Sequence, residues 1–354
     1  MTAPVMYGAT RPVADALPVL DGVLADRWDR RIRYLRVSIT DRCNYRCTYC
    51  MPAEGFQAMP RADLLSFEEI ARFVGVMAGM GVERVRLTGG EPLVRRDAVS
   101  LVRLLAETPG IREVAMTTNG HLLSAHAQAL HDAGLRCLTV SLDSFDPQTF
   151  THLTRGGRLD RVLAGLAEAQ RVGFTDIRIN TVLVRDQNDA QLGEIVEQCW
   201  RRGWLPRFIE LMPIGNAWGR DSDRRVTTGE ALSRLGTRYL LEADGVADDL
   251  PRGPARYFRV SKGEFAGQRV GLISPMSDHG FCSRCNRARL TARGGLRACL
   301  ADDHEVMVRD LLRSGASDAE LTQTIREAVG AKREAHRMGD LKTAPIQVMT
   351  AIGG

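Results

Sequence analysis

Hydrophobic and polar positions follow two periods in turn from Ile32 onward, one typical of strands and one typical of helices. The clearest helical stripe lies in Ser66–Met80, where Ser66 and Glu69 form a capping box. The predicted strands are Ile32–Thr40, Arg84–Thr88, Glu113–Thr118, Arg136–Leu142, Asp176–Leu183 and Arg207–Met212. Because strands and helices alternate along the chain, we expect an α/β fold with parallel strands joined by helical crossovers.

Polar and apolar side chains also alternate within several of these strands, for example in Leu35–Thr40. This alternation also fits an antiparallel sheet with one face in water, but helical crossovers favour a parallel sheet covered on both faces. A barrel whose polar face lines a lumen satisfies both patterns. Filled barrels prefer branched apolar residues inside, so a polar lumen predicts an open barrel that holds a polar ligand. Arg36, Arg86 and Arg178 lie on the polar faces and predict an anion; the alternative is a buried network of ion pairs with Asp or Glu.

The chain divides into three segments by composition and rhythm. Residues 1–28 contain three prolines and no periodicity, which predicts a mobile N-terminal arm. Residues 29–215 carry the strand–helix alternation and are the predicted partial barrel. Residues 216–354 are predicted as a C-terminal domain, with strand-like runs at Arg256–Val260 and Arg269–Ser274 followed by helical patterns.

Composition excludes two broad classes of protein. The chain has 354 residues, 44% hydrophobic and 26% charged, which excludes a wholly disordered protein. No apolar run approaches the roughly 18 residues of a membrane span, and no apolar segment typical of a secretory signal opens the chain. We therefore expect a cytoplasmic protein with no membrane partner. The net charge of +5 comes from 45 Arg and 3 Lys without a dense basic run, so we expect no nucleic-acid partner.

Six of the eight cysteines form two groups, which in a cytosolic chain indicates metal. In the first group, Cys43, Cys47 and Cys50 follow the first predicted strand, at the end where α/β barrels place their chemistry. Three thiolates can hold three irons of a cubane cluster and leave the fourth iron open. The alternative is a structural zinc site, which requires a fourth protein ligand.

In the second group, a predicted hairpin with its turn at 293–295 brings Cys299 back toward Cys282 and Cys285. Here a zinc site of three cysteines with His279 or His304 is an equally good interpretation. The two remaining cysteines, Cys137 and Cys199, have no such partners and are predicted to be buried, inert thiols.

Two motifs resemble those of the radical S-adenosylmethionine (SAM) superfamily. Residues 38–52, Ser-Ile-Thr-Asp-Arg-Cys-Asn-Tyr-Arg-Cys-Thr-Tyr-Cys-Met-Pro, resemble its cysteine signature, and residues 88–92, Thr-Gly-Gly-Glu-Pro, resemble its glycine-rich SAM motif. The second cysteine group, residues 286–290 and the terminal Gly353-Gly354 narrow the resemblance to the GTP 3′,8-cyclase family, molybdenum cofactor biosynthesis protein A. This resemblance covers residue 20 to the end and implies an incomplete (β/α)6 TIM-type barrel, with a C-terminal β-hairpin and helices closing the barrel.

The resemblance also implies the chemistry and the site. Two 4Fe–4S clusters, on Cys43, Cys47 and Cys50 and on Cys282, Cys285 and Cys299, together with SAM would convert GTP into 3′,8-cyclo-7,8-dihydro-GTP through a 5′-deoxyadenosyl radical. The residues carried over for SAM are Tyr49, Gly90, Ser141 and Met212. Those for GTP are Arg36, Arg86, Thr117, Arg178, Arg287, Ala288 and Arg289. Arg178 stands where the family usually has Lys, and in a chain with three lysines we interpret this as drift that keeps the charge.

The last expectations concern the binding partners of the protein and the alternative functions. The resemblance implies an electron donor such as flavodoxin or ferredoxin and a downstream cyclic pyranopterin monophosphate synthase, and it leaves a homodimer open. It also implies that the terminal Gly-Gly reaches the active site. One alternative is another radical SAM enzyme with an auxiliary cluster, such as a peptide-modifying one. The other is a zinc-stabilised binding protein without catalytic activity.

Overall fold

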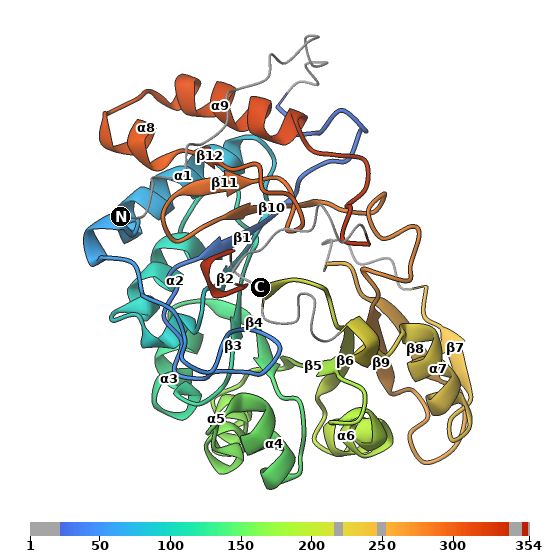
Figure 1. The fold of residues 1–354 in the computed structure, drawn as a ribbon. Helices are drawn as coiled ribbons and strands as arrows, with labels where there is room; N and C mark the ends of the chain where they lie inside the picture. Colours follow the sequence, from blue (N-terminus) through green and yellow to red (C-terminus); the bar gives the residue numbers. More distant parts are fainter. Residues whose placement is uncertain (1–21, 216–221, 246–252, 340–348, 353–354) are drawn as a thin grey trace, which may run out of the picture.

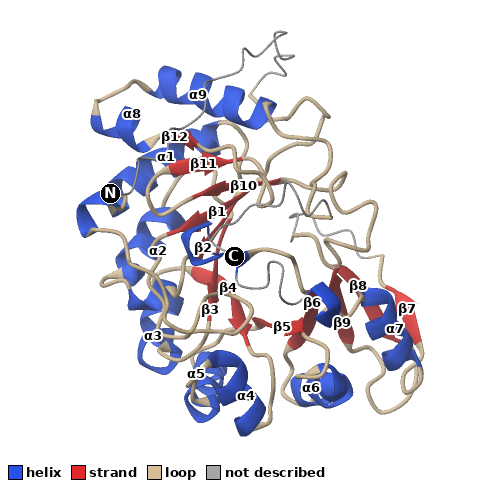
Figure 2. Cartoon of the chain, viewed as in Figure 1, coloured by secondary structure: helices blue, strands red, loops and turns tan. Residues whose placement is uncertain are grey.

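The strands of the described chain form one open, curved sheet (Figures 1 and 2). The computed structural model describes residues 22–215, 222–245, 253–339 and 349–352. The sheet order is β12-β11-β10-β1-β2-β3-β4-β5-β6-β9-β8-β7. The strands are β1 (Tyr34–Ser38), β2 (Arg84–Thr88), β3 (Glu113–Thr118), β4 (Leu135–Ser141), β5 (Asp176–Leu183), β6 (Leu205–Glu210), β7 (Leu241–Ala243), β8 (Arg256–Val260), β9 (Arg269–Ile273), β10 (Arg287–Leu290), β11 (Gly295–Arg297) and β12 (Val306–Met307).

Helices connect the parallel strands and cover the outer face of the sheet (Figure 1). They are α1 (Phe67–Gly79), α2 (Ala98–Ala106), α3 (Leu123–Asp132), α4 (Pro147–Thr154), α5 (Leu159–Arg171), α6 (Leu192–Trp200), α7 (Thr228–Gly236), α8 (Arg309–Arg313), α9 (Asp318–Gly330) and α10 (Met349–Ile352). Short 3₁₀ turns lie at Arg61–Asp63, Pro92–Val94, Asp189–Gln191 and Ser222–Arg224. The α1 capping box is confirmed, since the Ser66 side chain accepts from the Glu69 amide and the Glu69 carboxylate accepts from the Ser66 amide.

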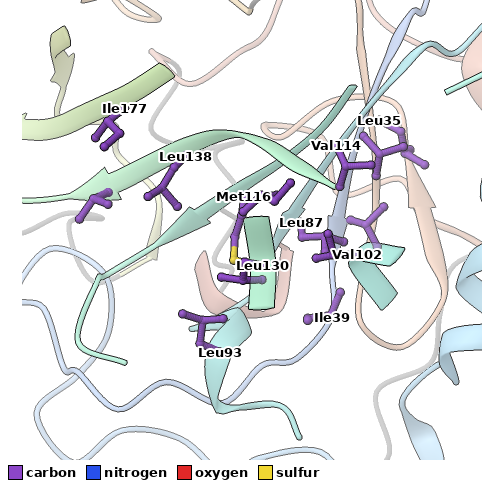
Figure 3. Packing of buried hydrophobic residues seen from close by; sticks show 14 of the residues in the cluster. Leu35, Ile39, Leu87, Leu93, Val102, Val114, Met116, Leu130, Leu138 and Ile177 are labelled. Atoms are coloured by element: carbon purple, nitrogen blue, oxygen red, sulfur yellow. The ribbon is translucent and has the colours of Figure 1, made fainter. Parts of the chain in front are cut away.

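The apolar side chains of the alternating strands pack outward, against the helices. Figure 3 shows Leu35, Leu87, Val114 and Leu138 in this layer, with Val102 contributed by α2. Burial of such side chains contributes about 25 cal/mol per Å² of apolar surface removed from water. The helices therefore bind one face of each strand, and the polar residues of the same strands point to the concave face.

Strands from the C-terminal third extend both sides of the six-stranded unit. β10 pairs in parallel with β1, with Arg36 opposite Arg289, and β9 pairs in parallel with β6, with Arg207 opposite Gly271. Antiparallel strands continue each edge, and β12 and β7 do not meet, so the described sheet is an incomplete barrel.

The segment predicted as a mobile arm lies largely outside the described residues. Of residues 1–28 the structure describes 22–28, and these contact the body of the protein: the Leu24 amide donates to the Met80 carbonyl at 2.8 Å, and Arg27 Nε donates to the Gly330 carbonyl at 2.8 Å. Within the described ranges, no helix is both long and apolar enough for a membrane span.

Candidate active site

A cavity of about 300 Å³ on the concave face is lined by all six grouped cysteines. Cys43, Cys47 and Cys50 come from the loop after β1, and Cys282, Cys285 and Cys299 come from the segment that contains the β10–β11 hairpin. The two groups are separated by more than half of the chain, yet they share one cavity. The hairpin predicted from the sequence is confirmed, because β10 and β11 pair in antiparallel register.

The glycine motif after β2 lies directly against the first cysteine loop. The Gly90 amide donates to the Thr40 carbonyl at 2.7 Å, and the Glu91 amide donates to the Arg42 carbonyl at 2.8 Å. A Cβ atom on Gly90 would lie 2.3 Å from the Arg42 carbonyl oxygen. Glycine is required here because two backbones approach each other too closely for a side chain.

The first cysteine group has the donor chemistry of an iron–sulfur site. Burial raises the pKa of Cys43 to about 11 and that of Cys50 to about 12, so these thiols ionise only beside a cationic partner. Three thiolates without a nearby fourth ligand suit a cubane with one open iron. A zinc site would need a fourth protein ligand beside the three thiolates.

The second group lies in a more cationic environment. Burial by itself would raise the pKa of Cys285, but the charges of Arg287 and Lys332 outweigh it and lower the pKa to about 6. The two histidines considered as zinc ligands, His279 and His304, are exposed and do not line the cavity. This group also fits a three-thiolate cluster site. Cys137 and Cys199 are buried, as predicted.

Arginines line the same cavity as the two cysteine groups. The wall contains Arg36, Arg86, Arg207, Arg287 and Arg289. Burial and the neighbouring guanidinium groups lower the pKa of Arg36 to about 10, and burial lowers that of Arg207. Glu91 is the one carboxylate among the described residues of the wall. The cavity therefore carries an excess of positive charge that a bound anion would neutralise.

Two of the predicted GTP residues do not line the cavity. Arg178 donates from Nε and Nη2 to the carboxylate of Asp176 at 2.7 and 2.6 Å, in a bidentate ion pair. For the arginines on the polar strand faces, the sequence left open two interpretations, anion binding or ion pairs with Asp or Glu. Arg178 forms such an ion pair. Ala288 packs in the hydrophobic core, because successive residues of a strand point to opposite faces and Arg287 and Arg289 take the cavity face.

Arg86 is held by protein groups on every side. Its Nε donates to Tyr34 Oη at 2.5 Å, and its Nη1 donates to Thr139 Oγ1 at 2.8 Å and to Thr117 Oγ1 at 3.2 Å. Its Nη2 donates to Cys137 Sγ at 3.3 Å. The guanidinium group and Thr117 thus form one hydrogen-bonded unit in the cavity wall.

The four residues predicted for SAM, Tyr49, Gly90, Ser141 and Met212, all line the cavity. Tyr49 donates its hydroxyl to Asp143 Oδ2 at 2.7 Å, and Asp143 Oδ1 accepts from the Val182 amide at 2.9 Å. Burial raises the pKa of Asp143 to about 6. Asp143 therefore positions Tyr49 without lining the cavity itself.

Sequence reasoning missed several cavity residues. Glu91 lies within the quoted glycine motif but was not singled out. Arg207 and Asn180 lie in predicted strands, and Asn119 lies just after one, but none was assigned to the site. His336 gave no signal. Thr118 Oγ1 donates to Glu91 at 2.7 Å, and the Asn119 amide donates to it at 2.6 Å. Burial raises the pKa of Glu91 to about 7.

Comparisons with known proteins agree with this geometry. Residues 37–199 match the model of the Radical SAM superfamily, and residues 206–338 match that of Molybdenum Cofactor Synthesis C. The Streptococcus suis protein SuiB has the same fold: its SAM-bound structure has a TM-score of 0.53 at 19% identity, covering 83% of this chain and 67% of SuiB. SuiB bound to the precursor peptide SuiA gives 0.56 at 16% identity, covering 85% and 67%. At these identities the likeness concerns the fold alone.

The fold, the first cysteine loop and the superfamily match define a radical SAM protein. The GTP 3′,8-cyclase of Moorella thermoacetica is 43% identical over 331 residues, which covers 94% of this chain and 100% of the relative. That of Marinobacter nauticus is 42% identical over 335 residues, covering 94% and 98%. The chain belongs to the GTP 3′,8-cyclase family.

Proposed function

We propose that this protein converts GTP into (8S)-3′,8-cyclo-7,8-dihydroguanosine 5′-triphosphate, the first step of molybdenum cofactor biosynthesis. The observation that carries the proposal is one cavity lined by two cysteine triads and five arginines. Each triad can leave one iron open, and the arginines suit a triphosphate.

The residues present fit the two clusters and SAM. Cys43, Cys47 and Cys50 would hold the cluster that binds SAM, and Cys282, Cys285 and Cys299 would hold the cluster at the guanine end of GTP. When bound, the N-terminal cluster and SAM supply a 5′-deoxyadenosyl radical, and the C-terminal cluster supplies an open iron for the base.

The chain itself binds and orients the two small molecules. Tyr49, Ser141, Met212 and the Gly90 backbone would contact SAM on the side of the first cysteine loop. Arg36, Arg207, Arg287 and Arg289 would bind the triphosphate, with Thr117 and Arg86 as a hydrogen-bonded support. For Ala288 we propose a packing role that keeps its two neighbouring arginines on the cavity face.

For Arg178 we propose that its positive charge attracts the triphosphate of GTP at longer range. Its ion pair with Asp176 occupies two of its three nitrogens, and Nη1 has no hydrogen-bond partner among the described residues. Because Nη1 is buried and Arg178 does not line the cavity, its proposed contribution is electrostatic and not a direct hydrogen bond to GTP.

The remaining expectations stay proposals. They are an electron donor such as flavodoxin or ferredoxin, transfer of the product to a cyclic pyranopterin monophosphate synthase, a homodimer and a cytoplasmic location. The terminal Gly353-Gly354 lies outside the described residues, while Met349 and Thr350 line the cavity. We propose that the tail contributes to the active site.

The test is anaerobic incubation of reconstituted protein with SAM, GTP and dithionite, followed by mass analysis. We expect 5′-deoxyadenosine and the cyclised nucleotide in equal amounts, both dependent on GTP. The protein should be brown, with about eight irons per chain if both sites hold full clusters. Colourless protein that contains zinc would contradict the radical mechanism, and GTP-independent 5′-deoxyadenosine with a modified peptide would favour the alternative enzyme class.

A further inference from the structure

Lys332 is a buried cation beside the second cysteine group. It is 3% exposed, and its Nζ donates to Cys285 Sγ at 3.3 Å and to the Arg287 carbonyl at 2.8 Å. These are its partners within the described part of the chain, where no carboxylate lies within ion-pair distance of Nζ. The ammonium group therefore has a sulfur and a carbonyl as neighbours, and no acidic side chain.

Burial of an ammonium group is costly unless a negative charge compensates it. The nearest side chain that can carry one is Cys285, whose sulfur becomes anionic when it ligates iron. A thiolate at Cys285 supplies the negative charge that buried Lys332 requires, and ligation of that sulfur to a cluster would keep it anionic. The nearby Arg287 adds a further positive charge, which makes an anionic partner still more necessary.

The choice of lysine at this position is itself informative. The chain contains 45 arginines and only 3 lysines, and one of these is buried at the cysteine group. A compact ammonium group can direct one proton at a sulfur and another at a carbonyl, whereas the planar guanidinium group requires a wider acceptor. Composition drift toward arginine does not explain this exception.

Residues 28–30, in the N-terminal segment, donate hydrogen bonds to the backbone carbonyls of Lys332 and of the two residues that follow it (Figure 1). Trp28 Nε1 donates to the Lys332 carbonyl at 3.2 Å, and Arg30 donates to the carbonyls of Arg333 and Glu334 at 2.6 and 2.7 Å. Arg30 also donates to the Cys282 carbonyl at 2.9 Å and pairs with buried Asp26. The same segment thus positions both the lysine and the cysteine loop.

We propose that Lys332 is a positioning residue that tunes the C-terminal cluster, by donating a charged hydrogen bond to the ligand sulfur of Cys285. This inference rests on the proposed function, because it requires a cluster on the second triad. Net charge and hydrogen bonds to sulfur set the reduction potential of iron–sulfur clusters. A positive donor stabilises the reduced, more negative cluster, so Lys332 raises the potential.

The test is an anaerobic redox titration of the intact two-cluster protein, monitored by electron paramagnetic resonance without GTP. The step of the C-terminal cluster is identified as the one that is absent from Cys282→Ser. In Lys332→Met we expect the ratio of reduced to oxidised C-terminal cluster at a fixed potential to fall about tenfold, which corresponds to a shift of about 59 mV for one electron. The step of the N-terminal cluster should not move.

Two further variants separate tuning from structural support. Lys332→Arg keeps the charge but loses the compact donor, so its ratio should lie between those of the native protein and Lys332→Met. Lys262→Met removes an exposed lysine and should change nothing. If Lys332→Met loses iron, the neutral donor in Lys332→Gln takes its place and should also lower the ratio. A full complement of iron with an unmoved C-terminal step would overturn the inference alone. Native protein with about four irons and no second step would overturn the proposed function as well.

Discussion

Charged residues in and near the cavity differ in how their buried charge is compensated. Arg178 is neutralised by Asp176, Arg86 is surrounded by neutral acceptors, and Glu91 accepts three hydrogen bonds from Thr118, Asn119 and Leu93. Glu91 is the one described carboxylate in a wall of arginines, so we expect it to lie near the positively charged amino or sulfonium group of bound SAM.

The raised pKa of Glu91, about 7, predicts a pH dependence of SAM binding. Burial disfavours the ionised carboxylate, so the anion predominates only above pH about 7. SAM affinity should therefore rise from pH 6 to pH 8, and below the pKa each unit of pH lowers the ionised fraction about tenfold. In Glu91→Gln the affinity should be lower and nearly flat over this range, as measured by anaerobic calorimetry. Glu83→Gln, just before β2, is the matched control, and an identical pH profile in Glu91→Gln would refute the assignment.

At the scale of elements, close contacts between loops and strands form the site. The glycine motif binds the backbone of the first cysteine loop, and β10 places Arg289 opposite Arg36 across a parallel strand pair. Each contact brings together residues that are distant in sequence.

Gly90→Ala should therefore displace the first cysteine loop. The added methyl group would meet the Arg42 carbonyl carbon and oxygen at 2.6 and 2.3 Å, and backbone atoms cannot move aside cheaply. Iron content should fall from about eight to about four per chain, with loss of SAM cleavage. Gly75→Ala in α1 is the control, because no atom lies within 4 Å of the added Cβ and a helical Gly→Ala change stabilises by up to about 1 kcal/mol. Full iron retention in Gly90→Ala would contradict the close approach.

At the scale of the whole molecule, the sheet brings two cysteine groups to one cavity. β10 and β9 add to opposite sides of the six-stranded unit, so the C-terminal third contributes to the cavity wall from both directions. Under the proposed function, this arrangement would place the cluster that binds SAM and the cluster that binds the base of GTP in one cavity.

Cys282→Ser should separate the two functions. The first cluster should remain, with about four irons per chain, and dithionite-driven SAM cleavage should persist at a reduced rate. Formation of the cyclised nucleotide should fall at least 100-fold, which corresponds to about 3 kcal/mol of lost positioning of the substrate. Cys199→Ala removes a buried thiol of α6 and should keep both clusters and activity. Undiminished cyclisation in Cys282→Ser would remove the proposed role of the second site.

Much of the fold and part of the site are predictable from local sequence. Hydrophobic periodicity predicted the six parallel strands and the start of α1 at Ser66, because strand and helix periods are local properties. Cysteine spacing likewise predicted both triads. The cavity faces of Arg36 and Arg86 followed from alternation along a strand, since the pleat has a period of two.

Only the tertiary structure decided which of these residues meet. Arg178 and Arg36 both lie on polar strand faces, but Arg178 forms an ion pair with Asp176, two residues earlier on the same strand. Only the packed structure shows that Arg178 makes this pair and does not line the cavity. The positions of β10 beside β1 and of Lys332 beside Cys285 depend on contacts between segments far apart in sequence. The sequence by itself determined the chemistry of the donors. The fold decided their partners, because pairing, burial and electrostatic environment are properties of the packed molecule.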